Sequence, residues 1–226
     1  MREFDIPVEK LIWKPRELQK VAVDFLVDNP CAGLLLSPGF GKTAVTLMAI
    51  KKLILRGLVK KVLIVAPLRI AHLVWPAQIE LWAQFHGMTY KVLHGKNKEG
   101  DLWSPADIYI TTPESLPWLL NTQTQLLKSG RSRILVDHAR WENAGFDLLV
   151  LDEMHKFKHT NTIRFRSLRQ VSVSMPRRWG LTGSPAARSL EDIFGQALIL
   201  DNGEALGRSI THFRTPYYTR GYDGYE

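Results

Sequence analysis

The stretch SPGFGKT, residues 37–43, follows a short apolar run that predicts a strand and opens a pattern that predicts a helix. Its glycines allow backbone N–H groups to curl around phosphate oxygens, and the N-terminus of the following helix favours negative charge. Lys42 is then expected to reach the β- and γ-phosphates of a nucleotide, and the Thr43 hydroxyl to bind Mg²⁺. The full eight-residue pattern begins with Gly, but this chain has Leu36 there, so a glycine turn before an ordinary helix is the alternative.

Short apolar runs recur along the chain and predict strands that are buried on both faces. They cover residues 31–37, 61–67, 90–95, 107–112, 146–153 and 177–183. Helical patterns fall between them, at residues 16–29, 43–57, 74–85, 113–128, 162–171 and 190–200. This alternation predicts an α/β fold with a doubly wound, mostly parallel sheet and helices on both faces. Residues 128–145 fit either a strand plus a loop or an insertion.

The stretch LDEMHKFK, residues 151–158, places two carboxylates and a histidine directly after an apolar run. A carboxylate at a strand end can hold Mg²⁺ through water, and Asp152 suits that role. Glu153 is then placed to polarise an attacking water, and His155 to relay to a neighbouring segment. The alternatives are a solvated turn or a zinc site, but zinc would need more His or Cys nearby than His159 provides.

Composition limits the class of protein. The 226 residues are 45% hydrophobic and 23% charged, which is typical of a globular domain with a sizeable core. No apolar run reaches the roughly 18 residues of a membrane span, and the first ten residues have no signal core, so we expect a cytoplasmic protein without a membrane partner. Lys and Arg exceed Asp and Glu by 30 to 22, and the net charge of +8 favours a polyanionic partner. The single cysteine, Cys31, is expected to be a small buried side chain.

Two further polar stretches accompany the predicted strand ends. PRELQ, residues 15–19, precedes the glycine loop, and the Gln19 amide has the donor and acceptor needed to read an adenine edge. LTGSP, residues 181–185, ends the last predicted strand, and its small polar residues can link the acidic turn to movement elsewhere. Ligands of doubly wound sheets bind outside the carboxyl ends of the strands, where these stretches gather.

The order of these motifs resembles the first RecA-like lobe of superfamily-two helicases and translocases, P-loop NTPases with a mostly parallel sheet. The Snf-type branch is the most similar, in particular the stand-alone enzymes of phages and prophages. PRELQ resembles the glutamine motif, PGFGKT motif I, APLRI (66–70) motif Ia, DEMH the D-E-x-H box, and LTGSP motif III. VLHGK (92–96), TTPESL (111–116) and residues 190–213 also resemble segments of this branch. The resemblance covers residues 16–218.

The resemblance implies a set of site residues. ATP would be bound by Arg16, Gln19, Pro38, Gly39, Phe40, Gly41, Lys42 and Thr43. Mg²⁺ would lie near Thr43 and Asp152, and hydrolysis would involve Lys42, Asp152, Glu153 and His155. Duplex DNA would be contacted by Pro67, Leu68, Arg69, Thr111 and Thr112, partly through backbone N–H and hydroxyl groups. Thr182, Gly183 and Ser184 would couple the two activities.

Nothing after residue 185 resembles the second RecA-like lobe or its arginine fingers, which contribute about 10³–10⁵ in rate. We therefore interpret residues 1–226 as a single N-terminal lobe, with an exit segment and tail at 201–226. We expect the Tyr- and Gly-rich residues 214–226 to be loosely ordered unless they dock on something. We expect the lobe to bind ATP·Mg²⁺, to hydrolyse ATP slowly, and to need a second lobe from a longer protein or another chain. A viral member would act in the cytoplasm of a bacterial host. A non-catalytic DNA-binding P-loop module and another P-loop enzyme, such as a kinase, are the alternatives.

Overall fold

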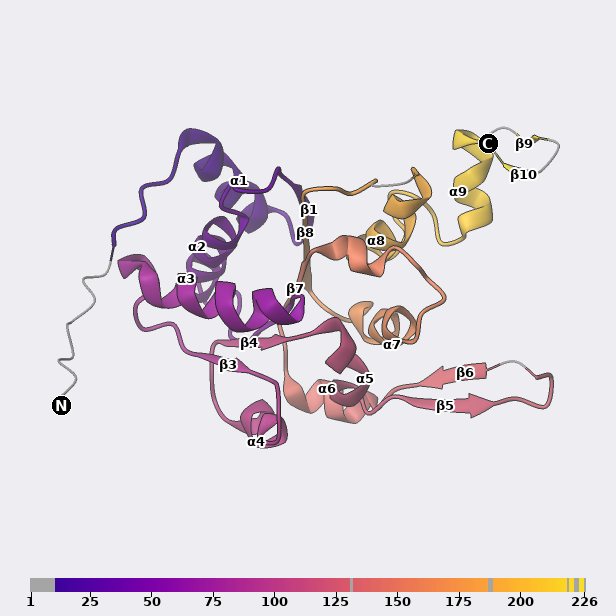
Figure 1. The fold of residues 1–226 in the computed structure, drawn as a ribbon, viewed down its shortest axis with the longest axis horizontal. Coiled ribbons are helices and arrows are strands. Elements are labelled where there is room, and N and C mark those ends of the chain that lie inside the picture. The colour runs from indigo at the N-terminus through magenta and orange to yellow at the C-terminus, as the bar shows by residue number, and fades with distance from the viewer. Residues whose placement is uncertain (1–10, 131, 187–188, 219, 222–223, 226) are drawn as a thin grey trace.

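A computed structural model describes residues 11–130, 132–186, 189–218, 220–221 and 224–225. Its centre is a six-stranded sheet in the order β1-β8-β7-β2-β4-β3, and all neighbouring strands are parallel (Figure 1). The strands are β1 Cys31–Leu35, β2 Val62–Val65, β3 Tyr90–Val92, β4 Ile108–Thr111, β7 Leu148–Asp152 and β8 Arg177–Thr182. Each strand lies within one of the six predicted apolar runs, so the predicted parallel sheet is confirmed.

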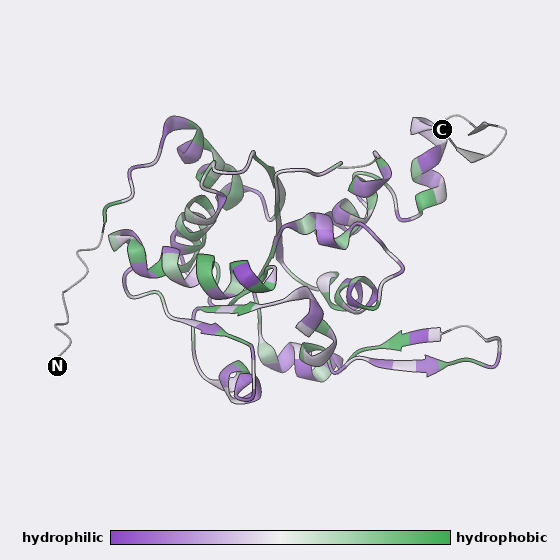
Figure 2. Ribbon diagram, in the orientation of Figure 1, coloured by the Kyte–Doolittle hydropathy of each residue, from purple (hydrophilic) through white to green (hydrophobic). Residues whose placement is uncertain are grey.

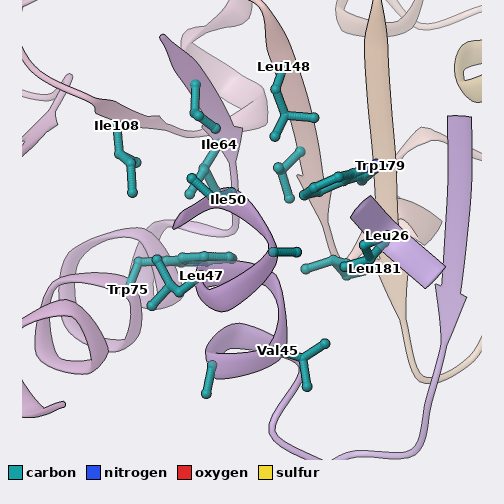
Figure 3. Packing of buried hydrophobic residues seen from close by; sticks show 14 of the residues in the cluster. Leu26, Val45, Leu47, Ile50, Ile64, Trp75, Ile108, Leu148, Trp179 and Leu181 are labelled. Carbon is teal, nitrogen blue, oxygen red and sulfur yellow. The ribbon is translucent and has the colours of Figure 1, made fainter. Parts of the chain in front are cut away.

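The sheet separates two hydrophobic cores, because neighbouring side chains of a strand point to opposite faces. Ile64 and Val150 belong to the core on one face, and Leu63 and Leu151 to the core on the other. Figure 3 shows the first core, in which the side chains of α2 meet those of the central strands. All four β2 side chains are fully buried, which explains why this strand reads as a continuous apolar run.

Helices cover both faces of the sheet, as predicted. The first core is covered by α1 Glu17–Asp28, α2 Lys42–Leu55, the π-helical turn η1 Ile70–Val74, α3 Trp75–Leu81 and η2 Ala83–Phe85. The second core is covered by α4 Lys98–Trp103, η3 Pro113–Ser115, α5 Leu116–Leu119, α6 His138–Ala144, η4 Met154–Phe157, α7 Ile163–Ser172, α8 Glu191–Asp201 and α9 Ile210–Tyr217. None of the helices in the described part of the chain is long and apolar enough to cross a membrane.

The helix predicted at residues 113–128 is wrong beyond Leu119. Asn121 adopts a left-handed conformation with φ 44°, which ends the short α5. The chain then forms an antiparallel hairpin of β5 Gln123–Leu126 and β6 Ser132–Leu135, which extends away from the sheet (Figure 1). Hydrophilic and hydrophobic residues mix along this hairpin (Figure 2), and every residue of β5 is exposed. The ambiguous stretch 128–145 therefore contains both the strand β6 and the helix α6.

Two details of the packing differ from what hydropathy suggests. In α1, Phe25 is 44% exposed, and the buried side of the helix includes the polar Gln19. Cys31 is exposed rather than buried, because β1 is an edge strand of the sheet and its alternate residues face solvent. In the tail, α9 precedes a short antiparallel pair, β9 Arg220–Gly221 and β10 Gly224–Tyr225, and the rest of the predicted loose tail lies outside the described residues.

Candidate nucleotide and metal site

The carboxyl ends of the parallel strands bring the predicted site residues to one edge of the sheet. The ladder pairs Leu35 at the end of β1 with Thr182 at the end of β8, and Leu181 with Asp152 at the end of β7. Strands β2 and β4 end together in the same way. The segments that follow therefore share this edge, as ligand-binding segments of open α/β sheets do: residues 37–43, 67–69, 112–115, 152–155 and 182–184.

The loop between β1 and α2 has the backbone of a phosphate-binding turn. Gly39 and Gly41 have φ values of 79° and 88°, in the left-handed region where glycine is strongly favoured. Phe40 N donates to Ser37 O at 3.3 Å, which closes the turn. Gly41 is the N-cap of α2, so the free N–H groups of the first helical turn face the loop. Ser37, Pro38 and Gly39 are exposed, and a phosphate therefore has access.

Gln19 braces this loop from α1. Its Nε2 donates to Phe40 O at 2.7 Å, while its Oε1 accepts from Arg16 N at 2.9 Å. A Cβ on Gly41 would lie 2.8 Å from the same Nε2, so glycine allows the close approach of the two segments. Gln19 is only 7% exposed, and Arg16 is the exposed N-cap of α1. The two amide atoms of Gln19 are thus occupied by backbone groups of two segments.

Lys42 points back into the loop that it follows. Its Nζ donates to Leu36 O at 2.8 Å and lies 3.3 Å from Ser37 O, which it also contacts as a donor. A β- or γ-phosphate would meet this ammonium group, together with N–H groups of the helix N-terminus. Leu36 therefore contributes through its backbone carbonyl, which any residue can supply, and its side chain is half-buried.

Asp152 is held in a buried position at the end of β7, where it is 6% exposed. Trp75 Nε1 donates to Asp152 Oδ2 at 2.9 Å, and Glu153 N donates to Oδ1 at 3.0 Å. Burial raises the pKa of Asp152 to about 6, against the opposing effect of the Trp75 hydrogen bond. The negative charge of Glu153 raises this pKa further and the positive charge of Lys42 lowers it, so these three groups share one electrostatic environment.

Glu153 and His155 continue the acidic turn. Glu153 adopts φ 54° and ψ 53°, a left-handed conformation that is rare for a residue with a side chain. Backbone strain of this kind costs on the order of 1–3 kcal/mol and clusters at functional sites. Glu153 Oε2 lies 3.2 Å from His155 Nδ1, which has no hydrogen-bond partner among the described residues. Both side chains are half-buried, so they are accessible from the strand-end edge.

The segment after β8 lies directly against the phosphate-binding loop. Leu36 N donates to Thr182 O at 3.2 Å, and Ser184 N donates to Thr182 Oγ1 at 3.2 Å. A Cβ on Gly183 would lie 3.0 Å from Pro38 Cδ, so this glycine also permits close packing. Thr182 is fully buried and Ser184 is exposed. Movement of this segment would therefore reach the phosphate loop through direct contacts.

The predicted DNA-contacting residues divide into exposed and buried groups. Leu68 and Arg69 are exposed, whereas Thr111 and Thr112 are 1% and 5% exposed. The Thr112 hydroxyl is hydrogen-bonded to Ser115 Oγ at 3.1 Å. The Thr111 hydroxyl is buried, and the structure provides it with no partner from the described ranges.

A groove of about 410 Å³ joins these segments. It is lined by Pro67, Leu68, His94, Thr112, Pro113, Glu114, Ser115 and Lys156. Sequence reasoning missed His94 and Lys156 as groove residues. Both residues lie in motif-like stretches, VLHGK and DEMHKFK, but nothing in a single sequence predicts that these two stretches meet in the fold.

The donor set at this edge fits a magnesium ion bound with a nucleotide. Thr43 is the second residue of α2, which follows β1, and Asp152 offers a carboxylate at the end of β7, on the other side of β8. Mg²⁺ is usually bound by one or two protein oxygens together with substrate phosphates and water, so this pair suffices. In the described ranges no three His, Cys, Asp or Glu side chains are grouped as a metal cluster, which argues against the alternative of a zinc site.

Together, the parallel sheet, the glycine loop on a helix N-terminus and the acidic strand end define a RecA-like P-loop lobe. The chain belongs to the SNF2-related domain family, whose model matches residues 18–210.

Comparisons with individual proteins agree with this family. The putative protein p41 of Acyrthosiphon pisum secondary endosymbiont phage 1 is 28% identical over 91% of this chain and 43% of its own length. The uncharacterized ATP-dependent helicase YqhH of Bacillus subtilis is 24% identical over 79% of this chain and 27% of its own length. Among solved structures, the SWI2/SNF2 ATPase core of Sulfolobus solfataricus in complex with dsDNA matches with a TM-score of 0.69 and 17% identity. The match covers 92% of this chain and 40% of the Sulfolobus chain. The chain thus spans less than half the length of these proteins.

Proposed function

We propose that this chain is the ATP-binding lobe of a DNA-dependent ATPase, a helicase or translocase that couples ATP hydrolysis to movement on DNA. The observation that carries the proposal is the arrangement around the phosphate loop. Gln19 donates a hydrogen bond to Phe40 O in the loop, and Lys42 points into the loop. The Asp152 carboxylate is buried at the end of β7, which is separated from β1 only by β8. Membership of the SNF2-related domain family supports the same reading.

In this proposal each residue of the edge has a role. The loop glycines and Lys42 bind the phosphates of ATP. Gln19 holds the loop close to α1, and the same side chain can meet the adenine. Thr43 and Asp152 would hold Mg²⁺, which neutralises phosphate charge when it is bound. Glu153, in its left-handed conformation, orients and polarises the attacking water, and His155 relays to neighbouring segments.

Duplex DNA is the proposed polyanionic partner. Exposed Arg69, the groove beside it with Lys156, and the net charge of +8 support phosphate contacts at the same edge. Pro67 and Leu68 shape the loop, and the buried Thr111 and Thr112 act through the backbone of this segment. The Sulfolobus structure was solved with dsDNA, which favours duplex over a single strand.

We further propose that the site is completed by a second RecA-like lobe that supplies arginine fingers, so that this lobe alone binds ATP·Mg²⁺ and hydrolyses it slowly. The similarity to a phage protein supports the cytoplasm of a bacterial host as the place of action.

The test compares ATP affinity and the ATPase rate, with and without duplex DNA, in the wild type and in Lys42→Ala. Loss of a charged hydrogen-bonding group typically costs about 1.5–3 kcal/mol, so ATP affinity should fall by roughly 10- to 150-fold. Lys52→Ala is the matched control, because Lys52 lies on the same helix and pairs with Asp24 instead. Equal ATP affinity in the wild type and Lys42→Ala would contradict the proposal.

Two outcomes would favour the alternatives. An ATPase rate that is the same with and without duplex DNA would point to another P-loop enzyme, such as a kinase. DNA affinity and salt dependence that are the same with ATP, without ATP and in Lys42→Ala would point to a non-catalytic DNA-binding module.

A further inference from the structure

Trp75 makes a buried hydrogen bond with the carboxylate of Asp152. The indole Nε1 donates to Asp152 Oδ2 at 2.9 Å, and the two residues are 77 positions apart in the sequence. Trp75 is fully buried and Asp152 is 6% exposed. A buried indole N–H needs a hydrogen-bond partner, and a carboxylate is a stronger acceptor than the backbone carbonyl that would satisfy the same need.

The bond restricts how the Asp152 carboxylate can turn. Oδ2 accepts from Trp75, and Oδ1 accepts from the backbone N–H of Glu153 at 3.0 Å. Donors on both oxygens fix the plane of the carboxylate, while each oxygen keeps a further lone pair for another ligand. Residues that contact a metal-binding carboxylate orient it and tune metal affinity.

Trp75 is itself held by an unusual piece of backbone. It is the first residue of α3 and directly follows the π-helical turn η1, and its N–H donates to Ile70 O across five residues. π-Helical turns are rare and occur frequently at functional sites. The side chain lies in the first core with Leu47 and Ile50 of α2 (Figure 3), so the indole has little freedom to turn away from Asp152.

The π-helical turn η1 directly follows the proposed DNA-contacting loop at residues 67–69. Ala71 N donates to Pro67 O at 2.8 Å, which joins the loop after β2 to the start of η1. The π-helical turn η1 therefore lies directly between the exposed Arg69, which precedes it, and Trp75, which follows it and is bonded to Asp152.

We propose that Trp75 is a positioning residue that sets the orientation of the Asp152 carboxylate toward Mg²⁺. This inference rests on the proposed function, because it assumes that Asp152 meets a nucleotide-bound metal. It assigns Trp75 a role beyond packing: without the indole donor, ATP alone should bind as before, but the gain in affinity that Mg²⁺ provides should shrink. Loss of such an outer partner typically lowers metal affinity about 10- to 100-fold.

Trp179 provides a matched control for packing. It is fully buried, belongs to the same core, and donates its Nε1 to Asn29 O at 3.0 Å, away from the acidic turn. Trp75→Phe and Trp179→Phe each remove one buried indole and one indole hydrogen bond. A role in packing alone predicts similar effects of the two substitutions on nucleotide binding.

The experiment titrates a fluorescent ATP analogue into the wild type, Trp75→Phe and Trp179→Phe, with Mg²⁺ and with EDTA. We expect the Mg²⁺-dependent gain in affinity to fall at least tenfold in Trp75→Phe only, with unchanged affinity in EDTA. In an Asp152→Ala background, Trp75→Phe should cause no further loss of this gain. Trp75→Met also lacks a hydrogen-bond donor and replaces Trp75→Phe if that variant does not fold.

Three results would overturn the inference. The first is an equal Mg²⁺-dependent gain in Trp75→Phe and the wild type, and the second is an equal loss in the two Phe variants. In both cases the proposed function stands, provided that the wild type binds the analogue and Lys42→Ala does not. The third is a wild type without Mg²⁺-dependent binding, which would remove the proposed function as well.

Discussion

The phosphate loop at residues 37–43 and the hairpin of β5 and β6 are both exposed, but they are held in different ways. The loop is braced by residues from other elements: Gln19 donates to Phe40 O, and Leu36 N donates to Thr182 O. The hairpin is held by its own antiparallel ladder and by two side chains of α7, which donate to Ser132 O and Ile134 O of β6. The shape of the loop therefore depends on distant residues, whereas the shape of the hairpin is largely local.

The sharpest test of this difference is Gly41→Ala. At φ 88° alanine is strained by about 1–2 kcal/mol, and its Cβ would displace Gln19 Nε2, which breaks a bond worth about 1 kcal/mol. We expect ATP affinity, measured by calorimetry, to fall roughly 100-fold. Gly57→Ala is the control, because Gly57 has φ 69° but open space around it. The bracing model fails if both variants bind ATP as the wild type does.

Two aspartates, Asp152 near the loop and Asp137 just after the hairpin, are expected to respond to pH with opposite sign. The pKa of Asp152 is raised from 3.8 to about 6, chiefly by burial, so the folded protein holds more protons than the unfolded chain between these values. The free energy of unfolding therefore decreases as pH rises through this window. Asp137, at the base of the hairpin, has its pKa lowered by the Arg140 backbone N–H, so its contribution is present above pH 3.8 and is lost as pH falls.

Asp152→Asn should therefore stabilise the protein at pH 8 in EDTA, by about 2 kcal/mol, from roughly 3 kcal/mol of relieved charge burial less about 1 kcal/mol for a weaker hydrogen bond. The gain should vanish near pH 4. Asp137→Ala should destabilise at pH 8, because it removes the N-cap of α6. Urea unfolding of each variant at pH 4, 6 and 8 measures both effects, and destabilisation by Asp152→Asn at pH 8 would contradict the argument.

The contrast between the two regions also explains what could be predicted from the sequence. The sheet was predictable, because strands such as Val62–Val65 are buried on both faces and read as unbroken apolar runs. The hairpin was not, because β5 is exposed throughout and pairs with residues that come after a turn, so helical spacing was misleading there. In α1 the helix was predictable, but its buried side includes Gln19, which hydropathy assigns to the surface.

The site shows the same limit. The motif residues could be named from the sequence, because glycines before a Lys-Thr pair and paired acids at a strand end are local patterns. The bonds that arrange them join distant positions, such as Trp75 with Asp152 and Gln19 with Phe40. A single sequence carries no signal for these pairs, since the same residue types also satisfy surface and core positions elsewhere.

A smaller effect than those above is expected from Gln19→Ala, for which Gln170→Ala is the control. Gln19 braces the phosphate loop, and Gln170 Nε2 donates to Ile134 O at the base of the hairpin at 3.1 Å. Each substitution removes two hydrogen bonds to the backbone, each worth about 1 kcal/mol, so both should lower stability by a similar amount. Only Gln19→Ala should lower ATP affinity, by roughly fivefold. Equal ATP affinities in the two variants would show that the loop keeps its shape without Gln19.

The smallest effect is expected where the hairpin is shortened. Thr124 and Ile134 pair across the ladder, so residues 125–133 can be replaced by the two-residue turn Asn-Gly, which suits a tight hairpin. Ile134 is kept because it is buried, whereas Leu126, which is removed, is 76% exposed.

The described residues that are lost lie on the surface, and the bond from Arg166 to Ser132 O that is lost with them is exposed. The free energy of unfolding should therefore change by less than about 0.5 kcal/mol, with ATP affinity within about twofold of the wild type. Urea unfolding and ATP titration of the shortened protein measure both quantities. A larger loss of ATP affinity would mean that the hairpin also braces the nucleotide edge, because the replacement leaves its base and the Asp137 cap in place.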